Sequence, residues 1–188
     1  MRRLRWILDD GPLDVLASLP DLTTLGLYPT GSLCVAPATA EAARQSESRT
    51  RLLGIAAADG GLLFDRPQIF LTDEDPVGSV YLDLRGEGSP LGSAECEAIA
   101  WASVHAEDAV VVIEDKRAAF AALAELGRSR VAHPFDLWIE LLESGAVSTA
   151  DFEHLCERSR GKDADLLRRA LPGRVRRRFS VRLPDGGE

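Results

Sequence analysis

Four acidic residues that directly follow apolar runs are the main chemical feature of this 188-residue chain. Asp9 and Asp10 come after the run at 4–8, and Glu114 and Asp115 come after the β-branched run at 110–113. Ligands of open parallel sheets bind outside the carboxyl ends of the strands. If the two runs are neighbouring strands, these carboxylates share one crevice, and their mutual repulsion favours a divalent cation. Oxygen ligands without His or Cys select Mg²⁺ or Mn²⁺, which serve phosphoryl chemistry.

Glu97 adds another carboxylate if the helix that carries it begins at the same edge. That helix is predicted over 94–105, with an N-cap at Ser89 or Ser93. Glu95 lies two residues earlier, about 200° away around the helix, so we expect it to point elsewhere. Each acid also has a simpler interpretation, since Glu97 could be solvated and Asp9 and Asp10 could merely cap a helix. Only the combination favours a metal site.

The elements that would position these acids alternate between short apolar runs and helical stretches, which is typical of an α/β fold with a mostly parallel sheet. Strands are predicted at 4–8, 32–36, 68–71, 79–84, 110–113 and 131–132. Helices are predicted after Pro12 and over 38–58, 94–105, 116–126, 134–144, 149–158 and 164–171. The segment 59–90 is the hardest to interpret, because Gly, Pro and Asp punctuate it.

Composition indicates one globular domain. The chain has 45% hydrophobic and 28% charged residues, which excludes disorder for most of it. No apolar run approaches the ~18 residues that span a bilayer, so we expect neither a secretion signal nor a membrane anchor. Three well-separated cysteines, Cys34, Cys96 and Cys156, fit a reducing cytoplasm, and we expect them to be small buried hydrophobes rather than zinc ligands.

The net charge of -8 conceals an asymmetry. Residues 158–182 hold ten basic side chains and two acidic ones, a net charge of +8, so the rest of the chain carries -16. An acidic body with a basic end allows a polyanion or an acidic partner to dock at one end. Arg174, Arg176 and Arg177 are the candidates for such contacts, although a solvated end explains them equally well.

Four segments, in order, resemble the motifs of PIN domain nucleases. Residues 8–13 (Leu-Asp-Asp-Gly-Pro-Leu) resemble the opening motif of the branch whose first acid precedes x-Gly-Pro-Leu, and residues 35–41 resemble the family's strand, Pro and helical Glu. Residues 94–100 (Ala-Glu-Cys-Glu-Ala-Ile-Ala) are similar to its Gly-Glu-Ala-Glu-Ala-Ile-Ala helix, and residues 112–118 to its Leu-Ile-Asp-Asp-Arg-Arg-Ala segment. Ala94 replaces the Gly, and Glu114 stands where the family's acid pair usually begins with Asp.

The resemblance covers residues 4 to about 145 and implies a three-layer α/β/α domain over 1–157, with a helical, Arg-rich extension over 158–188. It implies a Mg²⁺- or Mn²⁺-dependent ribonuclease that acts mainly on single-stranded RNA. The metal-ligand or metal-positioning roles fall on Asp9, Glu41, Glu97 and Asp115, and a phosphate contact on Arg117. Bacterial members are often toxins held inactive by a small antitoxin, so the implied partners are RNA and such a protein, with homo-oligomers also open.

Two other interpretations remain open. One is a PIN-like scaffold that no longer cleaves, which an ion pair from Arg117 into the acidic crevice would favour. The other is a receiver-like phosphoacceptor domain, in which residues 80–85 would be the strand that bears the acceptor Asp83. The wide separation between Asp10 and Asp83 argues against it.

Overall fold

Five parallel strands form the centre of the fold. The structure, a computed structural model, describes residues 5–69, 72, 74–105 and 108–159. Its strands are β1 (Arg5–Leu8), β2 (Leu33–Val35), β3 (Phe64–Asp65), β4 (Ala109–Val112) and β5 (Val131–Ala132). They lie in the order β3-β2-β1-β4-β5, and Leu8 at the end of β1 pairs with Val35 on one side and Val112 on the other. The predicted parallel α/β fold is confirmed.

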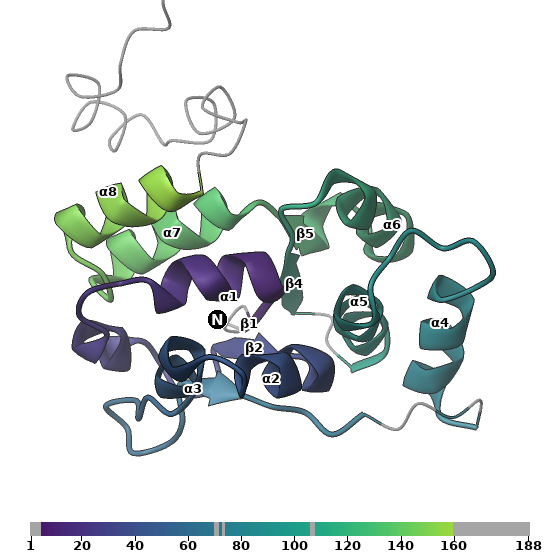
Figure 1. Ribbon diagram of the computed structural model, residues 1–188, viewed down its shortest axis with the longest axis horizontal. Helices are drawn as coiled ribbons and strands as arrows, with labels where there is room; N and C mark the ends of the chain where they lie inside the picture. Colours follow the sequence, from purple (N-terminus) through teal and green to yellow (C-terminus); the bar gives the residue numbers. More distant parts are fainter. Residues whose placement is uncertain (1–4, 70–71, 73, 106–107, 160–188) are drawn as a thin grey trace, which may run out of the picture.

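Helices surround this sheet (Figure 1). In the described part of the chain they are α1 (Asp10–Ala17), α2 (Pro37–Ala43), α3 (Glu47–Leu53), α4 (Pro76–Leu84), α5 (Ser93–His105), α6 (Lys116–Leu126), α7 (Pro134–Ser144) and α8 (Thr149–Arg158), with 3₁₀ turns η1 (Thr23–Leu27) and η2 (Arg128–Arg130). None of these described helices is long and apolar enough to cross a bilayer.

Side chains from alternate strand positions enter two separate cores, as the period of a strand requires. Trp6 and Leu8 of β1 pack with α1, α3, α7 and α8, whereas Ile7 packs with α4, α5 and α6. Helices therefore cover both faces of the sheet, which is an α/β/α arrangement (Figure 1). Because these strands are covered on both faces, they appear in the sequence as continuous apolar runs.

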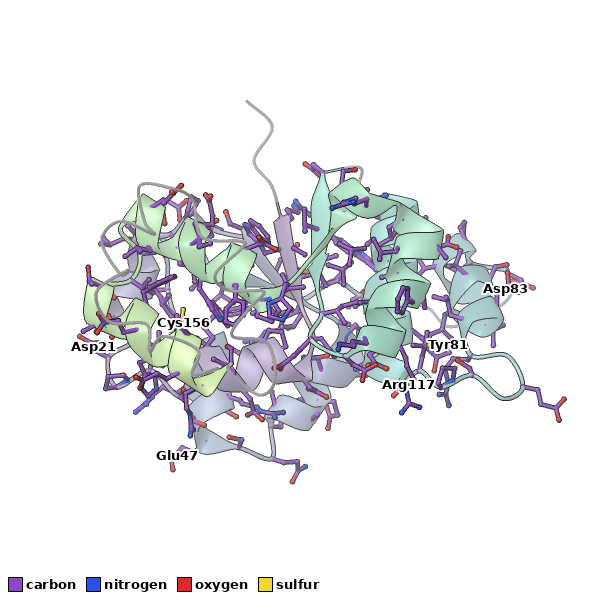
Figure 2. All side chains as sticks on the ribbon, turned by 90° about the horizontal axis from the view of Figure 1, so that it is seen from above. Asp21, Glu47, Tyr81, Asp83, Arg117 and Cys156 are labelled. Atoms are coloured by element: carbon purple, nitrogen blue, oxygen red, sulfur yellow. The ribbon has the colours of Figure 1, made fainter. Side chains whose placement is uncertain are left out.

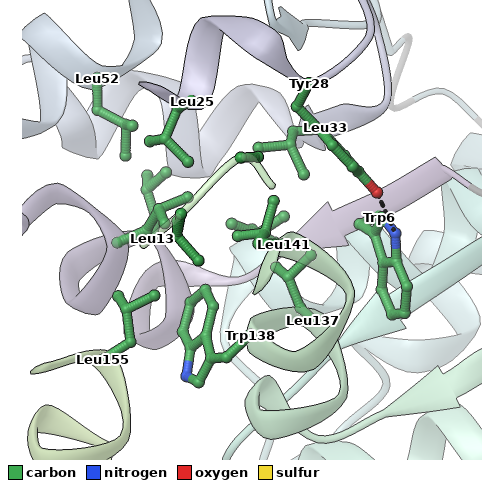
Figure 3. Packing of buried hydrophobic residues seen from close by; sticks show 14 of the residues in the cluster. Trp6, Leu13, Leu25, Tyr28, Leu33, Leu52, Leu137, Trp138, Leu141 and Leu155 are labelled. Atoms are coloured by element: carbon green, nitrogen blue, oxygen red, sulfur yellow. Dashed lines mark hydrogen bonds between the residues drawn. The ribbon is translucent and has the colours of Figure 1, made fainter. Parts of the chain in front are cut away.

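Two buried tryptophans have their indole N–H groups hydrogen-bonded. In the core of Figure 3, the Trp6 indole Nε1–H donates to the Tyr28 hydroxyl at 3.2 Å, and the Trp138 indole donates to Ser159 Oγ at 3.0 Å. Burial raises the pKa of Tyr28 to about 12. The three cysteines are also buried, as expected, and none of them forms a disulfide bond.

The segment predicted as a strand over 79–84 is instead part of α4, and that prediction is wrong. The Asp75 carboxylate caps the helix by accepting from the Val77 and Gly78 backbone N–H groups, and Pro76 occupies its first turn. Val77, Val80, Tyr81 and Leu84 have helical spacing, and all four pack into the core beside α5. Asp83 is therefore an exposed helical residue, and the receiver-like interpretation loses its strand-borne acceptor.

The helix predicted over 38–58 is two helices, because Ser46 adopts an extended conformation and its hydroxyl accepts from the Arg49 N–H to begin α3. Residues 68 and 69 of the predicted strand at 68–71 lie outside any strand, and 70 and 71 lie outside the described residues.

The predicted helices at 94–105, 116–126, 134–144 and 149–158 are confirmed, with the predicted capping box at Ser148 and Asp151. The predicted helix at 164–171 lies outside the described residues.

Candidate functional site

The strand order reverses between β1 and β4, and the predicted acids lie there. From β1 the chain proceeds outward to β2 and β3, and from β4 it proceeds in the other direction to β5. Such a reversal leaves a crevice at the carboxyl ends of the two central strands, where doubly wound folds bind ligands. The Asp9 N–H donates to the Val112 carbonyl across this junction at 3.4 Å. Asp9 and the Glu114–Asp115 pair therefore leave adjacent strands at the same edge.

Asp9 holds the N-cap position of α1 but does not cap the helix with its side chain. Its backbone carbonyl accepts from the Leu13 N–H at 3.1 Å, so the helix begins normally. Burial raises the pKa of Asp9 to about 6; the Asp10 backbone N–H opposes this rise, and the charges of Glu95, Asp10 and Asp115 add to it. Asp9 is thus a mostly desolvated carboxyl group surrounded by like charges, which is typical of functional sites.

Glu95 and Glu97 lie in different places, as their angular separation on the helix predicts, but the charge of Glu95 acts on Asp9. Among the charges that raise the pKa of Asp9, that of Glu95 is the largest. Glu95 is in the first turn of α5, and its Oε2 accepts from the Gly92 N–H at 2.6 Å. A helical side chain leans toward the N-terminus of its helix, so in a first turn it reaches past the helix end rather than out from one face. The position of Glu95 just after the predicted N-cap was the signal available in the sequence.

Glu97 is at the same edge but one strand further along. Its side chain is buried, with 6% of the residue exposed, and Oε2 accepts from the Ala38 N–H at 2.7 Å. Burial raises the pKa of Glu97, and the Ala38 N–H opposes the rise. Ala38 lies in the first turn of α2, just past the end of β2. Glu97 therefore links α5 to the start of α2.

Asp115 and Glu114 follow β4 and are both exposed. Asp115 caps α6, because its Oδ1 accepts from the Arg117 N–H at 2.8 Å and the Ala118 N–H at 3.0 Å. Glu114 lies over the first turn of α1, since a Cβ added to Gly11 would be only 3.1 Å from Glu114 Oε2. Glu114 thus lies beside the start of α1, and Asp115 lies at the start of α6.

Arg49 of α3 neutralises part of this acidic edge. Its guanidinium contacts Asp10 Oδ1 at 3.5 Å and Asp14 Oδ2 at 2.5 Å. The hydrogen bond to Arg49 lowers the pKa of Asp14. Burial raises the pKa of Asp10, and the Arg49 charge opposes the rise. Arg49 therefore faces the outer acids of α1.

The structure does not bring Glu41 into this group. Glu41 is exposed on α2, and its carboxylate pairs with Arg44 at 2.6 Å. Arg117 is exposed, and none of the ion pairs between described residues involves it. The ion pair that would favour an inert scaffold is thus not found among these residues. Arg174, Arg176 and Arg177 lie outside the described residues.

The donor set fits a hard divalent cation in its chemistry. Asp9, Glu95 and Asp115 offer only carboxylate oxygens, and their mutual repulsion would be relieved by Mg²⁺ or Mn²⁺. Within the described residues, however, no group of three or more His, Cys, Asp or Glu side chains is close enough together to hold a metal ion. Binding of such an ion would therefore require these carboxylates to move closer together.

Comparisons of the chain with models of protein families, with curated proteins and with solved structures found no match. By its fold, the chain is an α/β protein with an all-parallel sheet, and several acidic residues follow the strands at its topological switch point.

Proposed function

We propose that this protein is a metal-dependent nuclease of PIN type that hydrolyses phosphodiester bonds in RNA. The supporting observation is the placement of Asp9: a largely desolvated carboxyl group at the switch point, free of helix capping, with a pKa raised by burial and by the charges of Glu95, Asp10 and Asp115. Structural acids are usually paired or solvated, whereas an acid held near like charges indicates a binding site for a cation.

In this proposal Asp9, Glu95 and Asp115 hold Mg²⁺ or Mn²⁺. Such an ion, when bound, supplies an activated water and stabilises the leaving oxygen. Asp115 uses Oδ1 to cap α6, which leaves Oδ2 as its ligand atom. Capping also fixes the position of the carboxylate, as the ligands of a metal site require. Glu97 keeps α5 against α2 and so holds Glu95 at the crevice.

Arg117 and the basic end of the chain complete the proposed site. Arg117 follows Asp115 by two residues and is exposed, so its guanidinium is free to contact a phosphate of the substrate. Arg174, Arg176 and Arg177 would add electrostatic attraction for the RNA backbone. By its resemblance to bacterial toxins, the chain would be the toxic member of a pair, with a small antitoxin covering the acidic crevice.

Two observations favour a second candidate, a PIN-like scaffold that does not cleave. The described acids do not form a ready metal cage, and Glu97, which the resemblance assigns to the metal, is bonded to the Ala38 N–H instead. A scaffold would use the same crevice to bind a cationic partner without hydrolysis.

The two candidates differ in a cleavage assay. Purified protein is incubated with labelled single-stranded RNA or DNA in Mg²⁺, Mn²⁺ or chelator, and the products are separated by size. We expect RNA cleavage with either ion, none in chelator, and activity reduced to the chelator background in Asp9→Asn and Glu95→Gln. The control Asp83→Asn makes the same charge change on the exposed face of α4 and should cleave normally. Cleavage that persists in both site variants would exclude the nuclease.

A further inference from the structure

The exposed face of α6 carries an unusual aromatic residue. Phe120 is 73% exposed and is the only aromatic side chain classed as exposed in the part of the chain that the structure describes. Leu123, one turn further along, is 37% exposed. Ala119 and Ala121, on either side of Phe120 in the sequence, pack against the core instead, so Phe120 is largely open to solvent.

Two cations share this face. Lys116 and Arg117 precede Phe120 by four and three residues, a spacing that places side chains side by side on a helix. Both are exposed, and Figure 2 shows Arg117 at the rim of the molecule. Residues 116–124 contain no acid, and the Glu125 carboxylate at the far end of α6 accepts from Ser103 Oγ at 2.7 Å. The face is therefore a basic, apolar strip on a body that is otherwise acidic.

The strip begins at the candidate site. Asp115 is the N-cap of α6, and its charge acts on Asp9. With a rise of about 1.5 Å per residue, Phe120 is about 7 Å further along the helix than Asp115. A ligand with one phosphate at the crevice would thus meet Lys116 and Arg117 first and Phe120 next.

We propose that this strip, defined by Lys116, Arg117 and Phe120, binds the strand of a single-stranded nucleic acid next to the crevice. Lys116 and Arg117 contact phosphates, and an unpaired base stacks on Phe120. Stacking platforms beside basic side chains are how proteins bind single strands without reading their sequence. A duplex should bind the strip more weakly than a single strand does, since its bases are already stacked on one another. The inference rests on the proposed function and adds to it a surface on α6 that would bind the substrate strand by stacking.

The test is a binding measurement that does not depend on cleavage. Full-length protein in chelator is titrated into labelled single-stranded RNA at low salt, and fluorescence anisotropy reports the affinity, with the integrity of the RNA checked on a gel. We expect Phe120→Ala to weaken binding about tenfold and Phe120→Leu to weaken it similarly, whereas Phe120→Trp should bind RNA as tightly as the wild type does. In Phe120→Trp the fluorescence of the added indole should also fall when RNA binds. The signal can be assigned to this indole because the native tryptophans, Trp6, Trp101 and Trp138, are buried.

A matched control is Leu27→Ala, which removes another exposed apolar side chain, 67% exposed, on η1. It should bind as the wild type does. Arg117→Gln should weaken binding and make it less sensitive to salt, since one phosphate contact is lost.

Three results would overturn the inference. The first is unchanged affinity in Phe120→Ala. The second is equal affinity for duplex and single-stranded RNA. The third is a dimer in sedimentation that Phe120→Ala converts to a monomer, which would make the strip a protein interface. The proposed function can fail separately. If the wild type binds RNA through Phe120 but never cleaves it with Mn²⁺, the binding strip is supported and the nuclease function is excluded.

Discussion

Asp9 is kept in a state that costs the fold free energy. Burial and the charges of Glu95, Asp10 and Asp115 oppose its ionisation. Its side chain makes no capping hydrogen bond to α1 that would offset this cost. The folded protein therefore holds a proton on Asp9 at pH values where the unfolded chain has already released it. Such a penalty is expected where a site is selected for binding rather than for stability.

Replacement of Asp9 should show this penalty directly. Its pKa is about 6 in the folded protein against an ordinary value of 3.8, so the free energy of unfolding falls as pH rises from about 4 to about 6. We expect metal-free Asp9→Asn to be more stable than wild type by about 1 to 3 kcal/mol at neutral pH, with the difference gone below about pH 4. Urea denaturation at both pH values measures it. Asp83→Asn, an exposed control with the same charge change, should show no comparable gain.

Glu97 differs from Asp9 because its carboxylate has a partner. In Glu97→Ala the Ala38 N–H loses its acceptor at a partly buried position, which should lower the free energy of unfolding by about 1 to 3 kcal/mol. Glu97→Gln keeps an oxygen acceptor and should lose less than about 1 kcal/mol. Urea denaturation of the two variants distinguishes them, and equal losses would show that the hydrogen bond contributes little.

At the scale of elements, the site depends on how α1, α3 and α5 begin. α1 begins at the junction of β1 and β4, and Glu95 in the first turn of α5 acts electrostatically on Asp9 there. Arg49 ties α3 to two acids of α1 with a side chain only 16% exposed. It offsets part of the acidic charge of α1.

Removal of this tie should have a pH-dependent cost. Arg49→Gln leaves Asp10 and Asp14 without their cation, and we expect a loss of about 1 kcal/mol or less at neutral pH, since Asp14 is exposed. Arg49 lowers the pKa of Asp14, so its contribution is present above the ordinary value of 3.8 and disappears as pH falls through the lower folded value. Thermal denaturation at about pH 7 and about pH 3 checks this. A loss that is equally large in acid would mean that Arg49 acts by packing alone.

At the scale of the whole molecule, the sheet brings together acids that are far apart in the chain. Asp9, Glu95 and Asp115 come from three different parts of the sequence. A ligand that bridges them stabilises the folded state alone, because the unfolded chain cannot hold the three carboxylates together.

Binding of Mn²⁺ should therefore raise the melting temperature in a saturable manner. The rise should be larger at about pH 8 than at about pH 5, because a proton on Asp9, with its pKa of about 6, competes with the ion. Differential scanning fluorimetry over a Mn²⁺ series measures the effect, with Asp9→Asn expected to abolish it and Asp83→Asn to retain it. A rise of equal size in Asp9→Asn would place the ion elsewhere.

The sequence by itself determined the parallel α/β fold, because strands covered on both faces leave continuous apolar runs, and it placed Asp9 and Asp115 at strand ends. Helix starts such as Ser148 and Lys116 were also readable, since capping is local chemistry. The helical conformation of 79–84 was not predicted, because only its packing in the core beside α5 decides between a helix and a strand there. The different environments of the two acids of α5 depend on tertiary packing: the charge of Glu95 acts on Asp9, whereas Glu97 accepts from the Ala38 N–H. The position of α5 is set by its contacts with α2 and β1, which are distant in the chain.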